Sequence, residues 1–173
     1  MKKQIKLNKV ASIGYRGEVT AKVCSKKRVI KTIKCHNDGM PLLFARLASI
    51  LAGNAEAESL QMPKYLDAGR TVNGKFESFL VQRVYLTDGG VVAKEPTGDA
   101  YSVTFGSIIA FTNIMTSHAN DAITELRLCS SSNVGADDYL VKTNLTEPTT
   151  LNGQSSNLLV SWKMYITNAQ VSE

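Results

Sequence analysis

The strongest constraint in this sequence is an alternation of apolar and polar residues near its C-terminus. Every second position there is apolar: Leu158, Val160, Trp162, Met164 and Ile166. The positions between them are mostly polar, with Ser161 and Lys163 as examples. A period of two puts each set on its own face of a β-strand and does not fit an amphipathic helix. The segment therefore predicts a strand with one face in the core, and Trp162 is expected to anchor that core.

Several other segments carry β signals and are separated by turn residues. Val, Ile, Thr and aromatic residues gather in residues 18–25, 28–36, 76–85, 101–115, 123–130 and 139–145. Short strands at this spacing are typical of antiparallel sandwiches and jelly-roll-like barrels. Segment 76–85 is apolar on both parities, which predicts a central strand buried on both faces. We therefore expect a mostly β fold, an antiparallel β-sandwich or jelly-roll-like domain.

One segment has a helical period instead. Asn37 and Asp38 stand shortly before Pro41, a combination typical of a helix start. Apolar residues follow at i, i+4, i+7 and i+8: Leu43, Leu47, Ile50 and Leu51. They form one apolar stripe. The pattern predicts one amphipathic helix, about residues 40–53, that lies across a face or open end of a sheet.

Length and composition favour one domain over the whole chain, residues 1–173, with a basic N-terminal arm or edge hairpin at about 1–36. No apolar run reaches the roughly 20 residues that cross a bilayer, so we expect a cytosolic protein where it is made. Three cysteines without a C-x-x-C pair favour reduced, partly buried thiols; a Cys24–Cys35 bridge across a hairpin is the alternative.

Charge is distributed unevenly. Residues 1–36 hold eleven Lys or Arg and one acid, a net +10, whereas residues 37–173 hold nine bases and fourteen acids, a net −5. This polarity suits a subunit that meets an acidic surface at one end, either nucleic acid or a neighbouring protein. The alternative is a solvated edge hairpin whose lysines discourage unwanted strand pairing. The candidate assembly interface comprises Lys2, Lys3, Lys6, Lys9, Lys26, Lys27, Arg28, Lys31 and Lys34.

Motifs for catalysis or cofactor binding are weak. Residues 69–76 have the G-x-x-x-x-G-K spacing of a phosphate-binding loop, but Phe76 stands where a Ser or Thr must ligate Mg²⁺. The pair Asn73 and Gly74 reads more simply as a hairpin turn. His36 and His118 have no sequence-local metal-ligand partners, and the acids Asp137 and Asp138 read as solvated. We expect a protein that is not an enzyme and has no cofactor or metal.

Two groups of segments resemble virion proteins of tailed bacteriophages, including the crAss-like group. Residues 37–53 look like an "N-x-G-x-x-x-L … L-A-G" helix after a basic hairpin, and residues 62–65 like a Pro-aromatic turn. Residues 123–131, 140–142, 147–150 and 158–166 are similar to the "I-T-E-I-G-L-F-x-S … L-x-A-R … P-I-T … L-x-V-x-W-x-I-x-F" signature of phage head and tail accessory proteins. Arg127 and Cys129 replace its Gly and aromatic residue.

The resemblance implies a β-sandwich that packs against copies of itself or against a viral shell. We therefore expect a structural subunit of a phage virion, an auxiliary capsid protein or a head–tail or tail ring component, made in the host bacterial cytoplasm. Its partners would be other copies of itself and other virion proteins such as capsid, portal or tail, with no membrane. The alternatives are a carbohydrate- or surface-binding β module and a nucleic-acid-binding protein that uses the basic hairpin.

Overall fold

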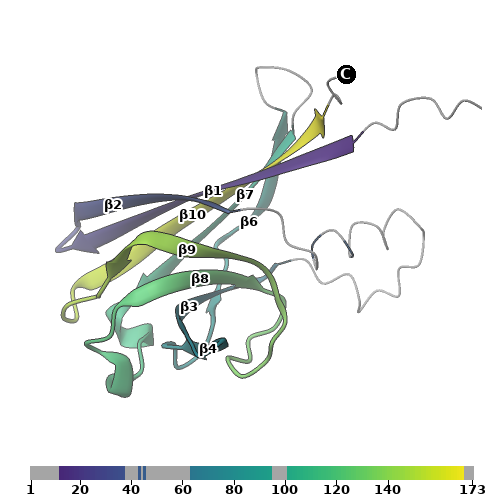
Figure 1. Cartoon of the computed structure of the whole chain (residues 1–173). Helices are drawn as coiled ribbons and strands as arrows, with labels where there is room; N and C mark the ends of the chain where they lie inside the picture. The colour runs from purple at the N-terminus through teal and green to yellow at the C-terminus, as the bar shows by residue number, and fades with distance from the viewer. Residues whose placement is uncertain (1–11, 38–42, 44, 46–62, 95–100, 170–173) are drawn as a thin grey trace, which may run out of the picture.

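The computed structural model describes residues 12–37, 43, 45, 63–94 and 101–169. These residues form two antiparallel sheets stacked in a sandwich-like arrangement (Figure 1). The predicted mostly β, antiparallel fold is thus confirmed. Two short 3₁₀ helices, η1 (Phe111–Asn113) and η2 (Thr116–His118), lie between β7 and β8.

The first sheet, sheet A, has the strand order β2-β1-β10-β7-β6. Its strands are β1 (Ser12–Ser25), β2 (Arg28–Asn37), β6 (Asp88–Lys94), β7 (Tyr101–Ala110) and β10 (Ser156–Ala169). The second, sheet B, has the order β4-β3-β8-β9. Its strands are β3 (Tyr65–Val72), β4 (Lys75–Ser78), β8 (Ile123–Cys129) and β9 (Tyr139–Thr149), and the short β5 (Val84–Tyr85) also pairs with β3.

The core lies between the two sheets and is centred on β10. The predicted alternation is confirmed, because Trp162 is fully buried while Ser161 is exposed. Trp162 stands opposite Val19 of β1 and Phe105 of β7, so it packs within a row across three strands. Sheet B contributes fully buried leucines from β3 and β8, namely Leu66, Leu126 and Leu128.

The two sheets are linked along both edges. Side-chain hydrogen bonds join them at one edge, and at the other the chain itself passes from sheet B to sheet A. At the edge formed by β2 and β9, the Thr143 and Thr146 hydroxyls donate to the carbonyl oxygens of His36 and Lys34, each at 3.4 Å. At the opposite edge the chain passes from β5 into β6, and the Thr87 amide donates to the Gly106 carbonyl at 2.8 Å. These links stabilise the stacking of the two sheets.

The prediction for residues 76–85 is wrong in one respect. The segment is no continuous central strand: β4 and β5 are two short strands on the same edge of β3, interrupted by residues 79–83. Phe79 is fully buried, whereas Val81 is 65% exposed. The segment has apolar residues at both odd and even positions because the chain kinks inward between the two strands. In the sequence, such a kink looks the same as a strand that is buried on both faces.

The predicted helix at residues 40–53 lies outside the described residues except for Leu43 and Ala45. Leu43 is buried and belongs to the core, which fits its place in the apolar stripe. The helix itself stays a prediction.

We predict that replacing Trp162 with Ala lowers the free energy of unfolding by about 3–5 kcal/mol, because a fully buried indole leaves a large cavity. Urea unfolding measures this loss, and Leu159→Ala, half-buried on the opposite face of β10, should cost clearly less. A loss below about 1 kcal/mol for Trp162→Ala, with solvent-exposed indole emission in the wild type, would contradict the assigned faces.

Candidate assembly interface

The turn between β1 and β2 has an uncommon backbone for its residues. Ser25 pairs with Arg28, so Lys26 and Lys27 form a two-residue hairpin turn, and their φ angles are +47° and +66°. Two positive φ angles are typical of a type I′ turn, which normally uses Asn-Gly because ordinary side chains are strained there. The β3–β4 turn has Asn73 and Gly74, with φ of +50° and +76°. The predicted hairpin turn at these two residues is confirmed.

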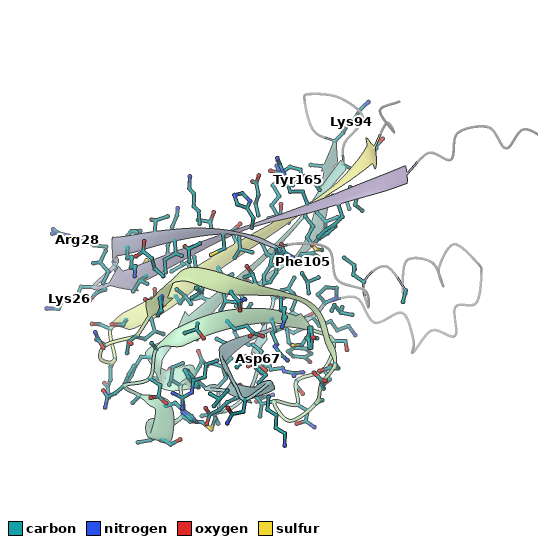
Figure 2. The ribbon with its side chains drawn as sticks, in the orientation of Figure 1. Lys26, Arg28, Asp67, Lys94, Phe105 and Tyr165 are labelled. Carbon is teal, nitrogen blue, oxygen red and sulfur yellow. The ribbon has the colours of Figure 1, made fainter. Side chains whose placement is uncertain are left out.

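The β1–β2 turn projects its cations into solvent at one end of sheet A. Figure 2 shows Lys26 and Arg28 pointing away from the ribbon at this end. Lys26, Lys27 and Arg28 are all exposed, and none makes an ion pair with another residue in the part of the chain described here. The next two residues, Val29 and Ile30, are 53% and 65% exposed. We call residues 26–30 the hairpin tip.

Acidic side chains, in contrast, are engaged within the fold. Every acidic side chain that the structure describes forms an ion pair: Glu18, Asp67, Glu77, Asp121, Glu125, Asp137, Asp138 and Glu147. None of these carboxylates is paired with a cation of the hairpin tip. Of the other seven acids of the sequence, Asp38, Glu56, Glu58, Glu95, Asp99 and Glu173 fall outside the described residues, and Asp88 is described in its backbone alone.

The structure divides the predicted interface residues into groups. Lys26, Lys27 and Arg28 gather at the hairpin tip, and Lys34 stands exposed on β2. Lys31 is tied to β9 by an ion pair with Glu147 at 3.0 Å. Lys2, Lys3, Lys6 and Lys9 lie outside the described residues. Strand β1 begins at Ser12, and a strand of this length places Ser12 about 45 Å from Ser25 beside the hairpin tip.

Sequence reasoning missed a buried ionic cluster on the outer side of sheet B. Its centre is Arg83, from the kinked segment between β4 and β5, whose side chain is 2% exposed. The Arg83 guanidinium donates to Asp67 Oδ2 at 2.8 Å, to Asp138 Oδ1, and to the carbonyl oxygens of Ser131 and Ala136. Asp138 is thus no solvated loop acid as predicted, and the cluster fastens residues 130–138 onto the sheet.

Hydrogen bonding sets the protonation of this cluster. Burial of Asp138 acts to raise its pKa, but donors from Arg83, Ser130 and the Ser131 amide outweigh burial and lower the pKa below 3.8. Burial likewise acts to lower the Arg83 pKa, and bonds to Asp67 and Asp138 raise it instead. Beside them, burial raises the pKa of the Cys129 thiol to about 12.

The structure also places the cysteines and one of the two histidines. All three cysteines are buried and free, as predicted, and Cys24 and Cys35 are not bridged. The His118 Nδ1–H donates to Asp121 Oδ2 at 2.8 Å and the imidazole ring stacks on Phe79, so His118 belongs to a side-chain network beside that ring. Among the described residues no cluster of His, Cys, Asp and Glu could hold a metal ion, and no helix could span a membrane.

We predict that Asp138→Asn destabilises the fold at neutral pH, and that the difference from wild type narrows in acid. A carboxyl whose pKa is lowered by folding stabilises the fold above its unfolded value of 3.8, and this contribution is lost as the pH falls through the folded pKa. Urea unfolding at neutral pH and at about pH 3 measures the difference in unfolding free energy between wild type and variant at each pH. An equal gap at both pH values would contradict the ionic role of Asp138.

The chain matches no protein-family model, no curated protein and no solved structure. A function is therefore inferred from the geometry and charge of the residues themselves and from the sequence resemblance described above.

Proposed function

We propose that this protein is a non-enzymatic structural subunit of a bacteriophage virion, of the auxiliary capsid or head–tail or tail ring type, that works through protein–protein contacts. The observation that carries the assembly role is the hairpin tip. Two lysines occupy left-handed backbone there, which costs an ordinary side chain roughly 1–2 kcal/mol per residue. The β3–β4 turn of the same chain avoids this cost with Asn-Gly. Backbone strain that is retained at an exposed site supports a function for the residues that cause it.

No ion pair of the described residues includes a cation of the hairpin tip, so these cations are free to meet an acidic partner. A second copy can supply one. Strand β6 ends at Lys94 and β7 begins at Tyr101, at the end of sheet A opposite the tip, and the sequence between them, outside the described residues, contains Glu95 and Asp99. Figure 2 places Lys94, where β6 ends, at that opposite end. A contact between opposite ends of two copies is head-to-tail and builds rings or lattices, as a virion subunit needs.

The virion assignment itself rests on the resemblance of residues 123–131 and 158–166 to phage head and tail proteins. Exposed apolar residues beside the cations favour a protein partner for the tip, since Val29 and Ile30 can be buried against a protein surface. The carbohydrate-binding alternative loses its best platform, because the single tryptophan, Trp162, is fully buried.

Nucleic acid is the second candidate partner, and one observation favours it. Lys22 and Lys34 are exposed on β1 and β2, the two strands that the hairpin tip connects. Together with the tip they extend the basic surface along sheet A. Binding to nucleic acid would differ from protein assembly in its salt dependence, because affinity then falls linearly with log salt as counterions are released.

We predict that the double variant Lys26→Asn/Lys27→Gly is more stable than wild type and assembles less well. Asn-Gly relieves the strained turn, which should raise the free energy of unfolding by about 1–2 kcal/mol. The same change removes two tip charges, so self-association in analytical ultracentrifugation at low salt should weaken. In the wild type, added salt should weaken association as well, because it screens the charges.

The control is Lys64→Asn, which removes one exposed charge on the sheet B side. It should leave association unchanged. Wild-type association in the tip variant would contradict the proposal, as would a wild type that stays monomeric and enters no particle. If instead the wild type binds bare DNA tightly, and the tip variant loses this binding but still assembles, the partner of the tip is nucleic acid.

A further inference from the structure

A second feature, separate from the hairpin tip, is an open pocket on the outer side of sheet B. Its volume is about 430 Å³, within the range of small-molecule sites. The β3–β4 hairpin, β8, β9 and the loop at residues 134–137 enclose it. Its charged and aromatic lining consists of Lys75, Phe76, Arg127, Asp137, Tyr139 and Lys142.

Arg127 is held rigidly in the wall of this pocket. Its side chain is 9% exposed, and its guanidinium carbon lies 3.9 Å from the ring centre of Phe76 and 4.2 Å from that of Tyr139. Phe76 belongs to β4 and Tyr139 to β9, so rings from both sides of β8 pack against the guanidinium. Its Nε donates to Glu125 Oε1 at 2.6 Å, and Glu125 Oε2 accepts from the Thr71 hydroxyl at 2.7 Å.

These contacts leave the Nη edge of Arg127 as the part available to a ligand. The described contact there is a loose one, to Asp137 Oδ1 at 3.5 Å. The Asp137 side chain is 85% exposed, and Asp137 stands between Ala136 and Asp138, which both accept hydrogen bonds from Arg83. An Nη edge is a planar fork of N–H donors that matches the two oxygens of a carboxylate or phosphate.

The charge of the pocket favours an anion. Glu125 neutralises Arg127, which leaves Lys75 and Lys142 against Asp137 alone. Lys142 stands directly opposite Arg127 in the register of β8 and β9, and Lys75 begins β4. An oxyanion at the Nη edge would therefore have two further ammonium groups in the same pocket.

We propose that this pocket binds an oxyanion-bearing ligand, a carboxylate or phosphate group, at the Nη edge of Arg127, and that Asp137 occupies this edge only until the ligand displaces it. Lys75 and Lys142 add charge attraction, while Phe76 and Tyr139 fix the plane of the guanidinium. The site is independent of the hairpin tip and of the assembly role.

The test is a titration with inorganic phosphate and, separately, with glucuronate, followed by ¹⁵N NMR of the backbone amides and of the Arg127 Nε–H. Saturable shifts at millimolar anion, confined to the pocket, are expected for phosphate, for glucuronate or for both, and the pattern identifies the preferred oxyanion. No saturation with either anion would overturn the proposal, and so would shifts that spread equally to the lysines of the hairpin tip.

The variant Asp137→Asn tests the displacement directly, because an exposed residue can be changed without disturbing the fold. It removes the competing carboxylate and should tighten anion binding severalfold, whereas Lys142→Ala should weaken it severalfold. Lys64→Ala, exposed but outside the pocket, is the matched control and should leave affinity unchanged. Unchanged or weaker binding in Asp137→Asn would contradict displacement and overturn the proposed site.

Discussion

The pairing of β1 with β10 is the constraint on which the other features of this structure depend. Fourteen consecutive residue pairs, from Ser12 with Ala169 to Ser25 with Ser156, join the two strands without a register shift. Because side chains alternate between faces, this register sends Trp162 into the core and the polar set to the outer face of sheet A. It also carries the β1–β2 turn to the end of the sheet opposite Ser12 and Ala169 (Figure 1). A slip of one residue would exchange the two faces.

The two sheets use their outer faces differently. Sheet A leaves its outer face and its basic tip to solvent, whereas residues 79–83 and 130–138 fold over part of sheet B and bury charged groups beneath them. A buried arginine is tolerable only when its donors are satisfied, and Arg83 meets this condition with four acceptors. Two adjacent acids of the same loop then have opposite roles: Asp138 anchors the loop, and exposed Asp137 faces the pocket of Arg127.

Local patterns sufficed for part of this structure and failed where distant segments meet. The alternation around Trp162 and the Asn73-Gly74 turn depend on neighbours in sequence, and both predictions are confirmed. The kink at residues 79–83 was missed because it is stabilised by Asp67, Ser131 and Asp138, and no local pattern reveals such partners. Glu125 and Arg127 alternate with the core leucines of β8 and face away from the core, and their burial depends on the distant loop that covers them. The basic residues were identified from their number in the sequence, whereas the gathering of Lys26, Lys27 and Arg28 at one hairpin tip follows from the pairing of β1 with β2.

The central claim is that the hairpin tip contacts the opposite end of another copy. Zero-length carbodiimide crosslinking of mixed ¹⁴N- and ¹⁵N-labelled protein tests it most directly, because this reagent joins a lysine to a carboxylate in direct contact, and mixed-isotope peptides identify links between copies. The account predicts mixed-isotope links from Lys26 or Lys27 to Glu95 or Asp99 in assembled protein, and their loss at high salt. Assembled protein in which both lysines stay unlinked between copies would contradict it.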